Sequence, residues 1–328
     1  MKEKLLTISI AAYNVEQYIE QCLQSIVACK YIDDIEVFVI DDGGTDKTAE
    51  VAEKYSSMFQ NSINIVRKSN GGYGSTVNYS ILHARGKYFK LLDGDDWFNT
   101  NGLEELIKQL KNNDYDMVLS NVLKGPSEDN LSLIDYVGEN IDSCKSGELS
   151  SIVGHWGITF KTNILRKSKL NLPEHCLYTD KLYSTIPFFY VKTIGLCNNS
   201  VYCYRTGRDG QSISRDSRIN HFSEYIKVCK LLFKFVENSD CMEKSYVFRR
   251  VINGYHLAIK TLLLLKICAK NRKLIIKFEK KCKEETPRVY YAASEANTKT
   301  GKILKWLRKS KYCLYYAFAL VPKSRIDF

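Results

Sequence analysis

The chain has 328 residues, of which 45% are hydrophobic and 26% are charged, a balance that excludes disordered and fibrous proteins. This length suffices for one large domain or two smaller ones. Eleven cysteines, scattered without metal-binding or disulfide-framework spacing, predict reduced thiols in a cytoplasmic protein. No signal peptide is expected, and no apolar run reaches the roughly 18 residues that a membrane span requires.

Positive charge is concentrated in the last third of the chain. Residues 221–328 contain 24 Lys and Arg against 9 Asp and Glu, whereas residues 1–220 contain 24 against 28. The net charge of +11 therefore comes entirely from the C-terminal part. This asymmetry predicts an anionic partner for that part, either a membrane surface or a nucleic acid.

Strand and helix patterns alternate at the start of the chain. Apolar, β-rich runs are separated by segments with helical periodicity. The predicted strands lie at 5–12, 35–40, 63–66, 87–92 and 117–121, and the predicted helices at 15–29, 48–59, 76–84 and 101–111. Such alternation implies right-handed crossovers and a mostly parallel sheet, in which ligands collect at the carboxyl ends of the strands.

The rest of the chain changes character along its length. Residues 125–147 are polar and irregular, and residues 158–160 and 178–212 are mixed, with a helix expected at 179–191 and a strand at 200–204. From His221 the pattern is almost wholly helical, with helices expected near 221–236, 243–269, 272–284 and 301–318. The predicted division is an α/β domain at 1–220 and a basic helical region at 221–328.

The acidic segment Asp93-Gly94-Asp95-Asp96 follows the fourth predicted strand. In an extended chain, alternate side chains share a face, so Asp93 and Asp95 point the same way. Two neighbouring carboxylates repel unless a cation lies between them, and Mg²⁺ or Mn²⁺ suits oxygen ligands. The alternative is an acidic surface turn in which Asp93 caps the helix that begins near Asn99.

Two further clusters also follow predicted strands. Asp41 and Asp42 end the second strand, where a carboxylate can accept a hydrogen bond from a base or a ribose hydroxyl, although a strand end and a helix cap would have a similar pattern. The Gly71-Gly72-Tyr73-Gly74 run permits close approach of a phosphate or sugar. Because it lacks the third glycine of the dinucleotide fingerprint, and no phosphate-loop motif occurs, NAD dehydrogenases and ATPases lose support.

Four motifs, in this order and at these intervals, resemble the family 2 glycosyltransferases of bacterial polysaccharide synthesis. They are Ala11-Ala12-Tyr13-Asn14, Asp41 to Asp46, Asn70-Gly71-Gly72 with Asn78, and Leu92 to Asp96. The resemblance covers about residues 5–215 and implies the GT-A fold, an α/β nucleotide-sugar-binding domain around a mostly parallel sheet. Ala11 stands where many members have proline, and Gly44 where serine is usual.

The resemblance implies a donor site at the strand ends. Tyr13 and Asp42 would hold the base and the ribose of a nucleotide-sugar, expected to be UDP-linked. Asp93 and Asp95 would hold the ribose and a Mn²⁺ or Mg²⁺ ion on the diphosphate. The implied donor-binding residues are Ala11, Tyr13, Asn14, Asp41, Asp42, Asn70, Gly71, Asn78, Asp93, Gly94, Arg205 and Ser212.

The segment from Leu172 to Asp180 resembles the part of the family that carries the catalytic acid pair, usually Glu-Asp. Thr179 replaces the glutamate, so the resemblance assigns Asp180 as the general base, with a helix N-cap as the alternative. Deprotonation of an acceptor hydroxyl during attack on the anomeric carbon requires one such base. The expected reaction is a single displacement with inversion, because a retaining double displacement also needs a nucleophile.

Other residues are expected around the acceptor and the leaving group. His155 and Trp156 would line the acceptor side, although a core tryptophan is the commoner case. Asp96 is either a cap or an acceptor-side residue. Arg205 or Arg208, in the segment that resembles the closing motif of the family, would stabilise the departing diphosphate, with a surface salt bridge as the alternative.

Residues 300–321 place lysines beside Trp306 and leucines at helical spacing, a pattern that suits a helix in an anionic membrane interface. A solvated basic face on an ordinary bundle is equally compatible with it. Peripheral association with the inner face of the membrane is therefore expected beside a cytoplasmic location.

The function predicted is metal-dependent, inverting transfer of a sugar to a hydroxyl of a cell-surface polysaccharide or a lipid-linked glycan precursor. A sugar-phosphate nucleotidyltransferase is the enzymatic alternative, but residues 11–17 lack the basic first loop of such enzymes. A basic nucleic-acid-binding module is the non-enzymatic alternative, with salt-sensitive binding as its signature. No nucleic-acid partner is expected for the glycosyltransferase.

Overall fold

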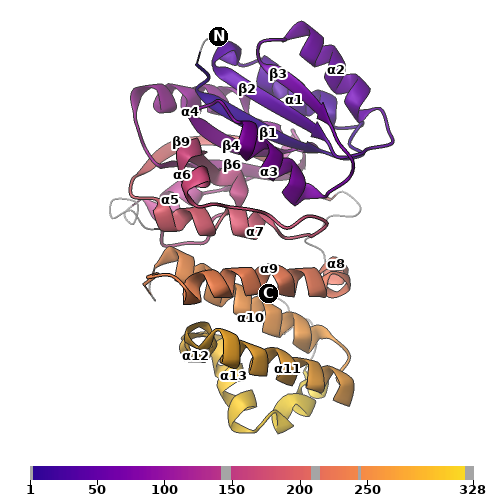
Figure 1. Ribbon diagram of the computed structural model, residues 1–328, viewed down its shortest axis with the longest axis vertical. Helices are drawn as coiled ribbons and strands as arrows, with labels where there is room; N and C mark the ends of the chain where they lie inside the picture. Colours follow the sequence, from indigo (N-terminus) through magenta and orange to yellow (C-terminus); the bar gives the residue numbers. More distant parts are fainter. Residues whose placement is uncertain (1–2, 142–148, 208–214, 243–244, 322–328) are drawn as a thin grey trace. The chain divides into compact units, whose positions relative to one another are not determined.

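The computed structural model describes residues 3–141, 149–207, 215–242 and 245–321. The chain divides into two compact units, Met1–Asp209 and Gly210–Phe328. Figure 1 shows that the first unit contains the strands, whereas the second is built from helices. The predicted boundary near residue 220 lies about ten residues further along the chain, and the roles assigned to the two predicted domains stay predictions.

The first four strands of the sheet are parallel. They are β1 (Leu6–Ala12), β2 (Ile35–Asp41), β3 (Ile63–Arg67) and β4 (Tyr88–Asp93), in the order β3-β2-β1-β4. Their apolar side chains form a buried core, with Ile8, Val37 and Leu91 essentially inaccessible. Because both faces of this part of the sheet are covered, the strands have continuous apolar runs.

The other half of the sheet contains antiparallel pairs. β8 (Ile158–Lys161) runs antiparallel to both β4 and β6 (Met117–Ser127), and β9 (Ile194–Arg205) is parallel to β6. The short β5 (Trp97–Phe98) pairs with β9. The predicted α/β fold around a mostly parallel sheet is confirmed, and these reversals are long-range pairings that local periodicity does not encode.

Helices connect the parallel strands. These are α1 (Ile19–Val27), α2 (Thr48–Met58), α3 (Tyr73–His83) and α4 (Thr100–Asn112). α2 lies beside β2 and β3, and α3 beside β1 (Figure 1). The side chain of Asn99 accepts a hydrogen bond from the Gly102 amide at 2.9 Å and caps α4. The alternative in which Asp93 caps this helix is therefore wrong.

Two predictions for the middle of the chain are wrong. The segment from residue 125, predicted to be irregular, contains the end of β6, the hairpin strand β7 (Asn130–Ile134) and α5 (Tyr136–Asn140). The helix expected at 179–191 is one turn, α7 (Asp180–Tyr183), followed by the 3₁₀ segment η4 (Ile186–Tyr190). Pro187 cannot donate the backbone hydrogen bond that a continuous helix needs.

The other described elements of the first unit are the 3₁₀ segments η1 (Ile32–Asp34) and η3 (His155–Gly157) and the helix α6 (Thr162–Lys167).

The second unit is helical, as predicted from residue 221 onward. Its elements are α8 (Arg215–Asn220), α9 (Phe222–Glu237), α10 (Tyr246–Leu264), α11 (Ala269–Glu285), α12 (Pro287–Glu295), α13 (Lys299–Lys309) and the 3₁₀ segment η5 (Cys313–Leu320). The sequence analysis missed α12. The helix predicted at 301–318 stops at Lys309 because Lys311 and Tyr312 take left-handed backbone conformations.

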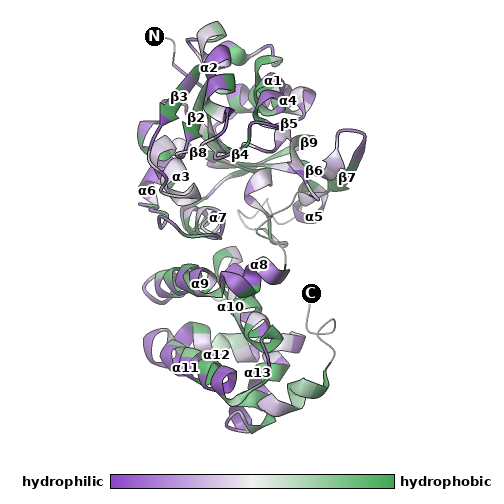
Figure 2. Ribbon diagram, turned by 90° about the vertical axis from the view of Figure 1, so that its right-hand side faces the viewer, coloured by the Kyte–Doolittle hydropathy of each residue, from purple (hydrophilic) through white to green (hydrophobic). Residues whose placement is uncertain are grey.

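Helix packing in the second unit surrounds a buried polar cluster. α9 and α11 carry both hydrophobic and hydrophilic residues (Figure 2), as expected of amphipathic helices. The buried Glu279 carboxylate accepts hydrogen bonds from Arg308 Nε at 2.6 Å and from the Tyr312 hydroxyl at 3.0 Å. The Tyr255 hydroxyl also donates to it. This cluster ties α10, α11 and α13 together, so each charge in it has a partner.

Lys90 of β4 is a fully buried lysine and lies where β4 meets η3 and β8. The Lys90 ammonium donates hydrogen bonds to the Trp156 carbonyl at 2.8 Å and the Ile158 carbonyl at 3.4 Å. Burial disfavours the charged form and lowers the pKa of Lys90 to about 7. Lys90 thereby ties the polypeptide around Trp156 to β4.

The pKa of Lys90 predicts a specific pH dependence of stability. The unfolded chain keeps this proton up to its ordinary pKa of 10.5, whereas the folded chain releases it near pH 7. Because the unfolded state binds more protons between these values, the folded state gains about 1.4 kcal/mol per pH unit. Urea unfolding at pH 7 to 9.5 should show this gain for the parent relative to Lys90→Met. The exposed control Lys54→Met should follow the parent, and parallel curves for the parent and Lys90→Met would contradict the prediction.

Candidate active site

Parallel pairing brings two acids to the same edge of the sheet. Ala12 of β1 is paired with Asp41 of β2, and Ala11 is paired with Asp93 of β4. Asp41 and Asp93 therefore flank the end of β1. This edge is the crevice at the carboxyl ends of the strands where open α/β sheets bind ligands.

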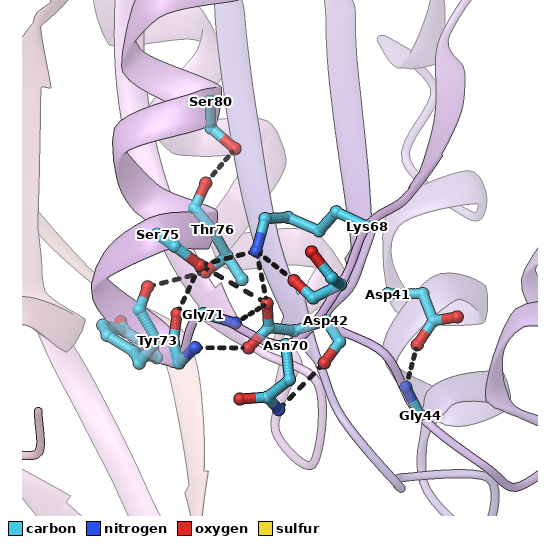
Figure 3. Close-up of polar contacts among 12 residues, drawn as sticks. Asp41, Asp42, Gly44, Lys68, Asn70, Gly71, Tyr73, Ser75, Thr76 and Ser80 are labelled. Atoms are coloured by element: carbon cyan, nitrogen blue, oxygen red, sulfur yellow. Dashed lines mark hydrogen bonds and ion pairs between the residues drawn. The ribbon is translucent and has the colours of Figure 1, made fainter. Parts of the chain in front are cut away.

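The Asp42 carboxylate organises the loop that follows β3 (Figure 3). It accepts hydrogen bonds from the amides of Gly71 at 3.0 Å and Gly72 at 2.7 Å, and from the Lys68 ammonium at 2.7 Å. The Ser75 hydroxyl, 3.3 Å away, also donates to it, and the Lys68 ammonium donates to Ser75 Oγ at 2.9 Å. Asp42 thus holds a turn in place, and the sequence analysis missed Lys68 and Ser75 because their partners are distant in sequence.

The loops after β1 and β2 are joined by short hydrogen bonds. The Asn14 side-chain oxygen accepts from the Thr45 amide at 2.8 Å, and Asp41 Oδ1 accepts from the Gly44 amide at 2.9 Å. A Cβ atom at Gly44 would lie 2.9 Å from Asp41 Oδ1, so glycine fits this close approach. Tyr13 is 51% exposed beside these loops. Its ring is therefore open to a ligand at this edge.

The acidic segment after β4 turns rather than continuing as a strand. The Asp96 amide donates to the Asp93 carbonyl at 3.0 Å, and the Gly94 amide donates to the Ala11 carbonyl at 3.1 Å. A Cβ atom at Gly94 would lie 2.9 Å from that carbonyl oxygen. The strand ends at Asp93, so the alternation of side chains predicted to put Asp93 and Asp95 on one face does not extend to Asp95. The position of Asp95 is set by the turn instead.

Asp96 is buried and turned inward. It accepts hydrogen bonds from the Tyr202 hydroxyl at 2.6 Å and from the Arg205 amide at 2.7 Å. Burial, followed by the charges of Asp93 and Asp95, raises the pKa of Asp96 well above its ordinary value. This corrects the expectation that Asp96 faces an acceptor, because both of its oxygens are used inside the fold.

Arg205 is anchored on the same turn. Its Nε donates to the Asp95 carbonyl at 2.8 Å, another guanidinium nitrogen donates to Gln21, and the guanidinium carbon lies 4.6 Å from the centroid of the Trp97 ring. Arg205 is thus held beside the acidic segment, and its contact with a diphosphate stays a prediction. Ser212 and Arg208 lie outside the described residues.

His155 lies between two carboxylates from different elements. Its Nε2 is 3.4 Å from Asp93 Oδ2, and its Nδ1 is 3.9 Å from Asp180 Oδ2. His155 itself is buried in η3, whereas the Asp180 side chain remains 37% exposed. His155 therefore lies between a predicted metal ligand and the predicted base, an arrangement that no local sequence pattern indicates.

The segment before Asp180 has an unusual backbone. His175 and Tyr178 take positive φ values of 46° and 66°. Non-glycine residues in this region are uncommon and concentrate at functional sites. α7 begins after Thr179, which makes no side-chain cap, so the alternative that Asp180 is the N-cap is wrong.

Two predicted residues have structural partners. The Asn78 amide nitrogen donates to the Leu172 carbonyl at 2.9 Å, and its oxygen accepts from the Leu172 amide at 2.9 Å. Asn78 therefore fixes the segment that leads to Asp180. The side chain of Asn70 donates to the Asp42 carbonyl at 2.9 Å. Both residues shape the site by holding loops.

Buried polar atoms without hydrogen-bond partners gather at this edge. Among the described residues they include Asp93 Oδ1, His155 Nε2, Trp156 Nε1 and Thr179 Oγ1. Burial and the charges of Asp93 and Asp180 raise the pKa of the nearby Tyr73 hydroxyl well above its ordinary value. Trp156 stacks on Tyr204 with ring centroids 4.3 Å apart. Unpaired buried groups are rare in proteins, and here they mark a place where a ligand supplies partners.

The donor set at this edge fits a shared metal site. Within the described ranges, no group of three or more His, Cys, Asp and Glu residues is arranged to hold a metal ion alone. Mg²⁺ in nucleotide enzymes commonly takes one or two carboxylates and completes its shell with water and phosphate oxygens. The unpaired Asp93 Oδ1 fits such a site.

Comparisons with known proteins identify the family of this chain. The sequence model described as Glycosyl transferase family 2 matches residues 7–171. The putative glycosyltransferase EpsH of Bacillus subtilis (strain 168) is 23% identical over 217 residues, which cover 62% of each protein. The poly(ribitol-phosphate) beta-N-acetylglucosaminyltransferase TarS of Staphylococcus aureus (strain MW2) is 22% identical over 270 residues, which cover 77% of this chain and 46% of TarS. The alignments thus span less than two thirds of these relatives.

Solved structures share the fold. S. aureus TarS 1-349 in complex with UDP-GlcNAc superposes with a TM-score of 0.70 at 18% identity, covering 96% of this chain and 90% of that one. The mannosyltransferase PcManGT from Pyrobaculum calidifontis, in complex with GDP-Man and Mn²⁺, gives 0.54 at 15% identity, covering 100% and 89%. With the family model matching half of its length, the chain belongs to the family 2 glycosyltransferases and has the GT-A fold.

Proposed function

We propose that this glycosyltransferase is metal-dependent and inverting, and that it moves a sugar from a UDP-linked donor to a hydroxyl of a cell-surface polysaccharide or a lipid-linked glycan precursor. One observation carries the proposal: Asp93 at the end of β4 and the partly exposed Asp180 meet at His155. Their proximity supports a single site in which one carboxylate holds the donor and the other acts as the base. The UDP-GlcNAc complex of TarS supports a UDP-linked donor.

The nucleotide is assigned to the edge formed by β1 and β2. The half-exposed ring of Tyr13 offers a stacking face for the base. In the described structure the Asp41 carboxylate has one hydrogen bond, from Gly44, and so retains capacity to accept from a base N–H or a ribose hydroxyl. Asp42, whose carboxylate holds the turn at Gly71 and Gly72, acts by keeping that loop in place.

Asp93 and Asp95 would hold the Mn²⁺ or Mg²⁺ ion together with the donor diphosphate. A bound divalent ion neutralises charge that develops on the departing diphosphate. The buried, unpaired Asp93 Oδ1 fits an ion ligand, and the Mn²⁺ complex of PcManGT supports the assignment. Arg205 keeps the turn at Asp95 in place through its hydrogen bond to the carbonyl of that residue.

Asp180 is assigned as the general base. Its carboxylate accepts the proton of the acceptor hydroxyl while that oxygen forms a bond to the anomeric carbon, and the bond to the diphosphate oxygen breaks on the opposite face. Its partial exposure leaves room for the acceptor to approach. The buried His155 lies beside it, with Nδ1 3.9 Å from Asp180 Oδ2.

The acceptor is assigned to the side of Trp156. Its ring stacks on Tyr204, and the side chain is only partly buried, so its exposed part can contact a sugar. The relative TarS is a poly(ribitol-phosphate) beta-N-acetylglucosaminyltransferase, which supports a polymer as the acceptor class.

Removing one proposed metal ligand tests the donor site. Asp95→Asn should weaken Mn²⁺-dependent UDP binding at least about tenfold, because an amide replaces a charged ligand. Calorimetric titration with UDP, in the presence and absence of Mn²⁺, measures the effect. The matched control Asp129→Asn removes an exposed aspartate in the β6–β7 turn and should bind like the parent. Equal binding by parent and Asp95→Asn would sink the metal assignment.

Asp180→Asn tests the base. The amide cannot accept the proton, so turnover should fall by roughly 10²- to 10⁴-fold, while the affinity for UDP stays close to that of the parent. Single-turnover transfer and UDP titration measure the two quantities separately, again with Asp129→Asn as the control. If Asp180→Asn retains normal turnover, the base is another residue.

The stereochemistry of the product tests the single displacement. Attack opposite the leaving group predicts a glycosidic bond whose anomeric configuration is inverted relative to the donor. NMR coupling constants of the purified product give this configuration directly. A product with the configuration of the donor would rule out the mechanism.

A further inference from the structure

One face of α13 is basic and exposed in the second unit. Thr300, Gly301, Leu304 and Leu307 are buried on the inner side of the helix. The outer positions carry Lys302, Lys305, Trp306 and Lys309, at the spacing of a single helical face. Trp306 is 65% exposed, far more than a tryptophan with a purely structural role requires.

The segment that follows adds an apolar surface. η5 has the sequence CLYYAFAL, with no charged residue, and Tyr315 is its one buried residue. Leu314 and Tyr316 are about half exposed, and Leu320 is 87% exposed. Adjacent exposed apolar side chains on a monomer indicate an interaction surface.

Arg272 of α11 holds this segment against the bundle. Its Nε donates to the Tyr312 carbonyl at 2.9 Å, and its Nη2 donates to the Lys311 carbonyl at 3.1 Å. α13 and η5 also contact each other. The basic helix and the apolar segment are therefore anchored next to each other.

The charge of this surface identifies its partner. Residues 299–321 contain six basic residues and no acidic one. Arg308 is bound to Glu279, which leaves the five lysines. Lysines flanking exposed Trp, Leu and Tyr match an anionic lipid interface, where headgroup phosphates meet the lysines and the acyl boundary accepts the apolar side chains. A nucleic acid would contact the lysines, but the apolar side chain of Leu320 would stay exposed to water.

We propose that residues 299–321 bind the surface of an anionic phospholipid membrane. Lys302, Lys305 and Lys309 contact headgroup phosphates, and Trp306, Leu314, Tyr316 and Leu320 enter the interface. The binding is peripheral, and among the described residues no helix combines the length and apolar content needed to cross a membrane. The proposal does not depend on the glycosyltransferase reaction, because lipid binding requires neither donor nor acceptor.

Vesicle sedimentation of the full chain tests the proposal. The parent should bind vesicles containing about one third phosphatidylglycerol far better than pure phosphatidylcholine vesicles, and about 0.5 M salt should weaken the binding. The triple variant Lys302→Gln, Lys305→Gln, Lys309→Gln should lose roughly 100-fold in affinity, at about fivefold per lysine. The control Lys47→Gln, Lys54→Gln, Lys124→Gln, with the same change in charge, should bind like the parent.

Depth of insertion gives a second readout. Brominated lipids should quench Trp306 fluorescence, and the quenching should disappear in Trp306→Phe, which still binds vesicles. Thermal melting checks that each variant folds. Absence of binding by the parent, equal binding to both vesicle types, equal loss in the two triple variants, or quenching that persists in Trp306→Phe would each overturn the proposal.

Discussion

The parallel pairing of β1 with β2 and β4 is the constraint on which the site depends. The register places Ala12 level with Asp41 and Ala11 level with Asp93. Three strand ends, each from a different part of the chain, thereby present polar loops at one edge. The apolar strands behind them are buried, so hydrophobic packing holds the acids in position.

The carboxylates at this edge differ in how many of their oxygens are bonded to protein donors, and this difference limits what each can do. Asp42 and Asp96 have both oxygens engaged by protein donors, so they organise loops. Asp93 keeps one unpaired oxygen, and Asp180 remains partly exposed. Buried carboxylates with protein partners stabilise the frame, whereas those with free capacity are available to a donor, an ion or a proton.

The second unit is built differently. Its helices pack around a buried Glu279–Arg308 pair with tyrosine partners, while many of its lysines remain on the outside. A buried charge pair of this kind favours a particular packing arrangement. The outward lysines contribute little to folding and are available to an anionic partner.

By itself the sequence determined the alternation of strands and helices, the strand ends at Asp41 and Asp93, the helical C-terminal region and the family. These follow from local periodicity and from motifs whose order and spacing are readable along the chain. Only the tertiary structure decided that His155 lies between Asp93 and Asp180, that Lys68 and Ser75 hold Asp42, and that Asp96 faces inward. Such contacts join residues far apart in sequence, and packing and desolvation, which no local pattern encodes, select them.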